Sequence, residues 1–140
     1  MNVDPAIIER LKSHVNRQRL VETARRLIEV PSPTGQAGAV SDRLASILTA
    51  DGFDVERPAG GYPESPAVVI RLQSGRPGRT LQFDGHLDTV HLPFAPPAIA
   101  DGRLTGSGAS DMKGGLAAAV EAVRALRESG GLTEIGRAHV

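Results

Sequence analysis

Apolar residues recur at helical spacing in the first fifty positions of the chain. Asp4 and Pro5 are typical of a helix start, since an aspartate side chain caps free N–H groups and proline tolerates the first helical position. The Pro31–Gly35 segment, Pro-Ser-Pro-Thr-Gly, indicates a break, because each proline disfavours helical backbone in the residue before it. Apolar side chains spaced by three and four residues therefore predict three helices, over residues 5–15, 20–28 and 40–48.

Beyond residue 52 the pattern changes to short apolar runs separated by glycine and proline. These runs predict strands over residues 53–56, 67–72 and 80–83, and a hairpin over 98–105 that turns at Asp101-Gly102. Helical spacing returns over 113–128 and ends at Gly130-Gly131. Helices on either side of near-continuous apolar strands predict the α/β class, with a central sheet flanked by helices.

Composition narrows the range of partners. The 140 residues suit one domain, and 40% hydrophobic with 23% charged residues exclude wholesale disorder. Sixteen basic and sixteen acidic residues leave no net charge to attract nucleic acid or an anionic membrane, and no apolar run is long enough to span a bilayer. We therefore expect a cytoplasmic protein with neither partner. The chain has no cysteine, so any metal must bind to His, Asp or Glu.

The first segment with candidate chemistry is Phe83–Val90, where a strand runs into a glycine and then presents His86 and Asp88. In extended chain, residues two apart share a face. A carboxylate can then hold one imidazole nitrogen while the other binds a metal. By itself this spacing also fits a solvated polar pair with no function.

The second segment, Gly106–Gly115, places Asp111 between glycines at the mouth of the last predicted helix. Small residues in the first turns of that helix allow close packing on the sheet, so we expect Asp111 at the carboxyl edge, where open α/β sheets bind ligands. The sequence departs from the dinucleotide and phosphate-loop patterns, because Asp111 replaces a required glycine and Lys113 is followed by glycine rather than Ser or Thr.

Together the two segments resemble the M20-type metallopeptidase and amidohydrolase family, which includes acetylornithine deacetylase, succinyl-diaminopimelate desuccinylase and glutamate carboxypeptidase. Gly85–Val90 is similar to its Gly-His-x-Asp-x-Val motif and Asp111–Gly115 to its Asp-Met-Lys-Gly-Gly motif. The resemblance covers most of residues 17–132, with Ser107 in place of a common arginine. It implies the N-terminal part of a metallopeptidase-like catalytic domain, truncated before an inserted dimerisation domain.

The resemblance also implies roles for residues. His86 and Asp111 would be metal ligands, Asp111 bridging two Zn2+ ions (Co2+ or Mn2+ being possible), and Asp88 would be a catalytic residue that orients His86. A metal-activated water would then cleave amide bonds of acyl-amino acids or small peptides. The general-base glutamate and the other ligands would lie beyond this chain, so we expect the 140 residues alone to be inactive and the complete enzyme to be a possible homodimer. A non-catalytic member of the same fold that binds a ligand or partner is the alternative.

Four structural expectations follow. His86 and Asp111 should converge at the carboxyl ends of neighbouring elements, and the resemblance suggests a cis peptide after Asp111. Lys113 should be a helix-start charge near the site rather than a catalytic group. Residues 135–140 match one reading frame of a sequencing adapter, so we expect residues 1–134 to form the domain and 135–140 a non-native, unpaired tail.

Overall fold

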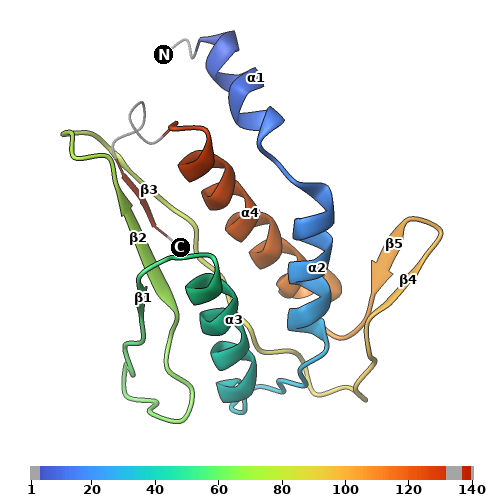
Figure 1. Ribbon diagram of the computed structural model, residues 1–140. Coiled ribbons are helices and arrows are strands. Elements are labelled where there is room, and N and C mark those ends of the chain that lie inside the picture. Colours follow the sequence, from blue (N-terminus) through green and yellow to red (C-terminus); the bar gives the residue numbers. More distant parts are fainter. Residues whose placement is uncertain (1–3, 132–136, 140) are drawn as a thin grey trace.

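The computed structural model describes residues 4–131 and 137–139, and it places a layer of helices beside a small sheet (Figure 1). The helices are α1 (Pro5–Ser13), α2 (Arg17–Ile28), α3 (Gly38–Ala50) and α4 (Gly114–Glu128). The strands are β1 (Val55–Glu56), β2 (Val69–Gln73), β3 (Thr80–Gln82), β4 (Ala98–Ala100), β5 (Arg103–Thr105) and β6 (Arg137–His139). An irregular turn, Ala109–Lys113, leads into α4.

The predicted helices are present, and their ends follow from local chemistry. The Asp4 carboxylate accepts a hydrogen bond from the N–H of Ala6 at 2.9 Å, which caps α1. The Asn16 side chain does the same for α2, accepting from the N–H of Arg19 at 3.0 Å. After α3 the chain turns through Gly52 at φ +78°, a backbone conformation that only glycine adopts without cost.

The sheet has the strand order β1-β2-β6-β3. The β1–β2 and β2–β6 pairs are antiparallel and the β3–β6 pair is parallel. The predicted hairpin forms as a separate pair, β4–β5, which projects from the molecule (Figure 1) and turns at Asp101 and Gly102, both at positive φ. The predicted α/β class with a sheet flanked by helices is confirmed.

The expectation of an unpaired tail is wrong for the backbone of Arg137–His139. This segment forms β6, which pairs with β2 on one side and with β3 on the other. A gap between two strands leaves two rows of backbone donors and acceptors to be paired, which favours an extended segment of almost any sequence. Residues 132–136 and 140 lie outside the described residues. The non-native origin of residues 135–140 stays a prediction.

One apolar core joins the helices to the sheet. Its members come from α2, α3, α4, β2 and the turn before β1: Leu27, Val40, Leu44, Ile47, Leu48, Phe53, Ile70, Leu116, Val120 and Val123. Phe83 and Leu87, which follow β3, pack against the same cluster. The core therefore holds the chain on both sides of His86 in place.

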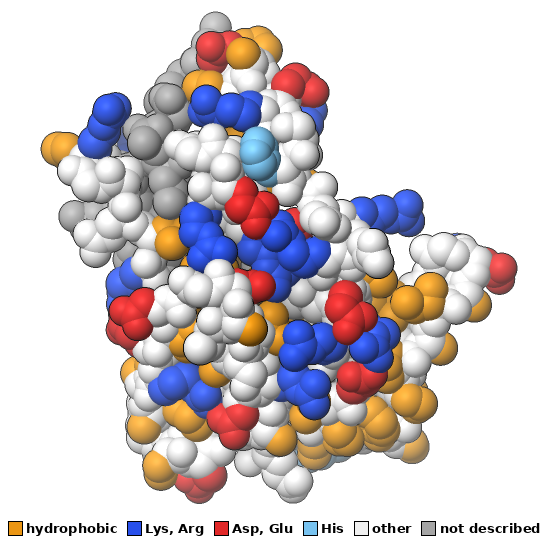
Figure 2. Space-filling view, in the orientation of Figure 1, with side chains coloured by type: hydrophobic (Ala, Val, Ile, Leu, Met, Phe, Trp, Pro, Cys, Tyr) orange, Lys and Arg blue, Asp and Glu red, His pale blue; other side chains and the backbone are white. Residues whose placement is uncertain are grey.

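The surface mixes charges of both signs. Figure 2 shows Lys and Arg side chains interspersed with Asp and Glu on the face that carries the helices. Large exposed apolar side chains gather in the loop and hairpin between the two motifs, at Val90, Leu92, Phe94 and Ile99. Within residues 4–131 and 137–139, no helix has the length and apolar character needed to cross a bilayer.

Candidate metal site

The segment that carries His86 and Asp88 is held by the loop after α2. Pro33 forms a parallel bridge with Thr89, whose N–H donates to the carbonyl of Ser32 at 2.8 Å. The buried Ser32 hydroxyl donates to the carbonyl of Leu87 at 2.9 Å. The Pro31–Gly35 segment, which was predicted to end a helix, therefore also fixes the backbone on both sides of Asp88.

Asp111 is carried by the irregular turn that precedes α4. The turn begins after Gly108 at φ +80° and contains the extended residue Asp111, at φ −127° and ψ 96°. The peptide between Asp111 and Met112 is cis, as the resemblance suggested. Gly85 allows the turn to approach the strand end, because a Cβ atom there would lie 2.7 Å from the Met112 Cε and 2.8 Å from the Leu116 Cδ2.

The two motifs meet at one imidazole ring. His86 Nε2 lies 3.1 Å from Asp111 Oδ1, and His86 Nδ1 lies 3.1 Å from both Asp88 Oδ1 and the Asp88 carbonyl oxygen. The predicted convergence of His86 and Asp111 is confirmed. The site is open to solvent, with 48% of the His86 side chain and 77% of the Asp111 side chain exposed.

Hydrogen bonds set the charge states around this ring. Desolvation alone would lower the pKa of His86, but the Asp88 carbonyl and the Asp111 carboxylate outweigh it, so the pKa of His86 is raised. The pKa of Asp88 is lowered, chiefly because the Thr34 hydroxyl donates to its Oδ2 at 2.6 Å. Asp88 is therefore a carboxylate at neutral pH, and it favours the imidazole form with the proton on Nδ1.

Thr34 is a site residue that the sequence reasoning missed. Its hydroxyl also lies 3.5 Å from the Thr89 carbonyl, and its N–H donates to that carbonyl at 3.2 Å. The available signal was its place in the Pro-Ser-Pro-Thr-Gly segment, where a threonine follows two prolines beside a turn glycine. Thr34 links the loop after α2 directly to the carboxylate that orients His86.

Lys113 lies directly before α4, at the helix start where a charge near the site was expected, but it is buried. Its side chain is fully buried, and its ammonium group donates to the carbonyl of Val30, just beyond α2, at 2.8 Å. Burial lowers the pKa of Lys113 to about 8. The aliphatic chain passes Gly108, where a Cβ atom would lie 3.1 Å from the Lys113 Cδ. Lys113 thus ties the turn that carries Asp111 to the end of α2.

The donor set suits part of a metal centre. An imidazole nitrogen and a carboxylate oxygen converge, and both are ligands that Zn2+ accepts. Asp88 occupies the other imidazole nitrogen, as carboxylates next to metal-binding histidines commonly do. Among the described residues, no group of three or more His, Asp or Glu side chains could hold an ion. His91, in the loop that follows, is exposed.

Comparison with known proteins gives concordant matches. Residues 82–136 match Peptidase family M20/M25/M40. Succinyl-diaminopimelate desuccinylase of Methylobacterium radiotolerans is 40% identical over 119 residues, covering 77% of this chain and 30% of that protein. The enzyme of the same name from Gluconacetobacter diazotrophicus is 44% identical over 117 residues, covering 76% of this chain and 30% of that protein.

A solved structure agrees with these matches. A tripeptidase from Staphylococcus aureus superimposes with a TM-score of 0.66 at 27% identity, covering 90% of this chain and 36% of that one. The chain thus spans about a third of the length of the proteins it matches, as the resemblance to part of a catalytic domain implied.

Proposed function

This chain belongs to peptidase family M20/M25/M40, and on that premise we propose that it supplies part of the metal site of a hydrolase acting on amide bonds. The substrates would be acyl-amino acids or small peptides. The relatives named as desuccinylases favour N-acyl-amino acids within that range. The observation that carries the proposal is the 3.1 Å approach of His86 Nε2 to Asp111 Oδ1, with Asp88 on the opposite ring nitrogen.

His86, Asp111 and Asp88 would each have a separate role at the metal site. Bound zinc would supply a water of lowered pKa and would polarise the substrate carbonyl. His86 would bind through Nε2, since the proton that Asp88 holds on Nδ1 leaves the Nε2 lone pair free. The Asp111 carboxylate would bind beside it and neutralise part of the metal charge. Asp88 would keep the ring oriented and would stabilise its positive character.

Finer features of the proposal come from the family resemblance. We propose two Zn2+ ions bridged by Asp111, with Co2+ or Mn2+ as substitutes, in a complete cytoplasmic enzyme that forms a homodimer. Two donors from this chain satisfy half of a four-coordinate zinc site. The remaining ligands and the general base would come from elsewhere in the complete protein, and we expect the 140 residues alone to lack amidase activity.

Metal titration of the 140-residue chain tests the proposal. Zn2+ added to the 15N-labelled protein should shift the His86 side-chain signals and the Asp111 amide signal. His86→Ala and Asp111→Asn should each weaken binding by about tenfold or more, and Asp88→Asn should weaken it by a factor of about ten. His91→Ala is the matched control, since His91 is an exposed loop histidine outside this cluster. Equal losses in the His91→Ala and His86→Ala proteins would refute the proposed site.

A further inference from the structure

The residue before His86 is in direct contact with the residue after Asp111. A Cβ atom added to Gly85 would lie 2.7 Å from the Met112 Cε and 3.1 Å from the Met112 Sδ. Both distances are shorter than the separation of about 3.5 Å at which such atoms attract each other. Gly85 does not have a positive φ, so this close contact, rather than the backbone conformation, requires glycine there.

A second contact of the same kind lies on the other side of the His86–Asp111 pair. Here the glycine belongs to the Asp111 segment, since a Cβ atom added to Gly108 would lie 2.8 Å from the Thr89 Cγ2. Thr89 is itself fixed, because its N–H and its hydroxyl both donate to the carbonyl of Ser32, at 2.8 Å and 3.3 Å. Each segment thus provides one glycine and one side chain to the other.

The two contacts and the His86–Asp111 pair follow one register. The first contact lies one residue before the histidine and one residue after the aspartate. The second lies three residues after the histidine and three residues before the aspartate. The two segments therefore cross in opposite chain directions, with the metal-binding pair between the two contacts.

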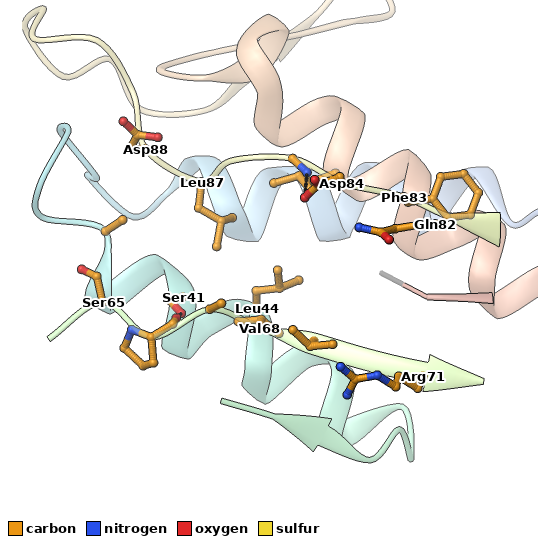
Figure 3. A pocket seen from close by; sticks show the side chains of 16 residues that line it. Ser41, Leu44, Ser65, Val68, Arg71, Gln82, Phe83, Asp84, Leu87 and Asp88 are labelled. Atoms are coloured by element: carbon orange, nitrogen blue, oxygen red, sulfur yellow. Dashed lines mark hydrogen bonds between the residues drawn. The ribbon is translucent and has the colours of Figure 1, made fainter. Parts of the chain in front are cut away.

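A cavity of about 420 Å3 borders another side of the His86 segment (Figure 3). Leu87 and Asp88 line it from this segment, and Val68 lines it from the facing chain. Gly85 lines it as well. A cavity provides no packing contacts. Apart from the core contacts of Phe83 and Leu87, the position of His86 therefore depends on the loop after α2 and on the turn that carries Asp111.

We propose that the two contacts form a clasp that sets the distance between the metal-binding side chains, and that Met112 and Thr89 are positioning residues. The clasp consists of the Gly85–Met112 contact and the Thr89–Gly108 contact. This proposal rests on the metal site proposed above.

The distance that the clasp would set suits zinc. With zinc–ligand distances of about 2.0–2.2 Å, two donors on one tetrahedral ion lie about 3.3 Å apart. His86 Nε2 and Asp111 Oδ1 lie 3.1 Å apart. Both donors would therefore bind one ion with little rearrangement, whereas a clasp that is too full or too loose would separate them.

A double-variant experiment tests the Gly85–Met112 contact. Gly85→Val adds about as many side-chain atoms to the contact as Met112→Ala removes. Each substitution alone should weaken Zn2+ binding in calorimetric titrations of the 140-residue chain, Gly85→Val by about tenfold or more. Added to Gly85→Val, Met112→Ala should instead strengthen binding, because the valine then occupies the space that the methionine leaves. The effect of Met112→Ala thus changes sign.

Leu72→Ala is the matched control for this rescue. Leu72 of β2 packs against the same core as Met112, and the substitution removes a similar number of atoms away from the clasp. It should not restore Zn2+ binding in the Gly85→Val protein. Urea titrations of the metal-free proteins measure stability separately from metal affinity.

Thr89→Ser tests the second contact. It removes the methyl group that meets Gly108 and keeps the hydroxyl that donates to Ser32, so Zn2+ binding should weaken. Thr105→Ser is the matched control, since it also loses a methyl group and keeps its bond to the Ala98 carbonyl, in the hairpin. Its Zn2+ affinity should equal that of the parent chain.

The outcomes separate positioning from packing. A change of sign in Zn2+ affinity, together with a loss in Thr89→Ser, supports the clasp. A change of sign in stability alone, or additive losses of Zn2+ affinity, would overturn it. If Gly85→Val does not fold, unchanged affinity in both Met112→Ala and Thr89→Ser would overturn it. A parent chain that binds no Zn2+ would overturn the metal site and the clasp with it, and that result is seen before any variant is made.

Discussion

Charged side chains are buried at the interface between α2 and α4, whereas they are exposed at the edge that carries His86. Glu121 and Arg124 of α4 are buried, with 1% and 3% of their side chains exposed. The Glu121 carboxylate accepts bonds from the Asn16 N–H and from the side chains of Arg19 and Arg124. At the other edge His86 and Asp111 are exposed and bonded to each other through a single pair of atoms.

This difference indicates that the charges in the helix interface stabilise the fold, whereas the charges at the site are available to bind a ligand. A buried carboxylate is tolerated only when its charge is paired and its oxygens are hydrogen-bonded, so the Glu121 cluster is saturated and cannot take another ligand. The His86–Asp111 pair is solvated, so exchanging its mutual bond for a metal ion costs little. We therefore expect substitutions in the helix interface to change the free energy of unfolding, and substitutions at the site to change binding.

The largest effect should come from Glu121→Leu. It leaves the guanidinium groups of Arg19 and Arg124 short of a buried partner, and the free energy of unfolding should fall by about 3 kcal/mol in urea titrations. Glu22→Ala removes an exposed pair with Arg25 and should cost less than about 0.5 kcal/mol. If Glu121→Leu lowered the free energy of unfolding no more than Glu22→Ala does, the proposed difference between the two regions would be wrong.

Lys113 lies between the two regions and gives an intermediate, pH-dependent effect. Its pKa falls from 10.5 to about 8 on folding, so between these values the unfolded chain binds more protons than the folded one. Stability of the metal-free protein should therefore rise with pH, by roughly 2 kcal/mol between pH 8 and pH 10.

The Lys113→Met protein provides the comparison. It lacks the buried amine, so its free energy of unfolding should stay nearly level over the same pH interval. Urea titrations of both proteins at pH 8, 9 and 10 measure the difference. Parallel curves for the two proteins would show that Lys113 is solvated rather than buried.

The smallest effect should come from Thr34→Val, which removes the hydroxyl that donates to Asp88 while keeping the side-chain shape. The pKa of Asp88, measured from its carboxyl 13C shift, should rise toward its usual value. Since Asp88 has a lowered pKa in the folded chain, its contribution to stability is present at neutral pH and is lost as pH falls through that value. Thr34→Ser should retain the lowered pKa, and Thr105→Val, in the hairpin, is the control.

Much of the fold could be predicted because local rules and tertiary packing agree there. Asp4 caps the helix that Pro5 begins, and the turn at Asp101-Gly102 closes the expected hairpin. The two motifs were recognisable because residue type and spacing both carry chemistry, so the approach of His86 to Asp111 followed from their places at the ends of adjacent elements.

The remaining features depend on partners distant in sequence. Charged residues on a helix are usually solvated, and nothing local indicates that Glu121 meets Arg19 across 102 positions. The burial of Lys113 depends in the same way on the carbonyl of Val30, 83 positions earlier. The bond between Thr34 and Asp88 depends on how the loop after α2 crosses the strand end. Predicting each of these contacts requires the three-dimensional path of the chain, which the spacing of residues along the sequence does not give.

His86 and Asp111 lie 25 positions apart in the sequence, and the chain between them makes an excursion away from the site. This excursion contains the apolar loop and the β4–β5 hairpin. Two hydrogen bonds join its two strands of chain: the N–H of Ser107 donates to the Ala95 carbonyl, and the Ser107 hydroxyl accepts from the Ala95 N–H, each at 2.9 Å. Doubling the length of such an excursion adds only about 0.6 kcal/mol of closure cost. Insertions or exchanged loops between Val90 and Thr105 should therefore be tolerated in evolution and in engineering, while His86 and Asp111 keep their positions.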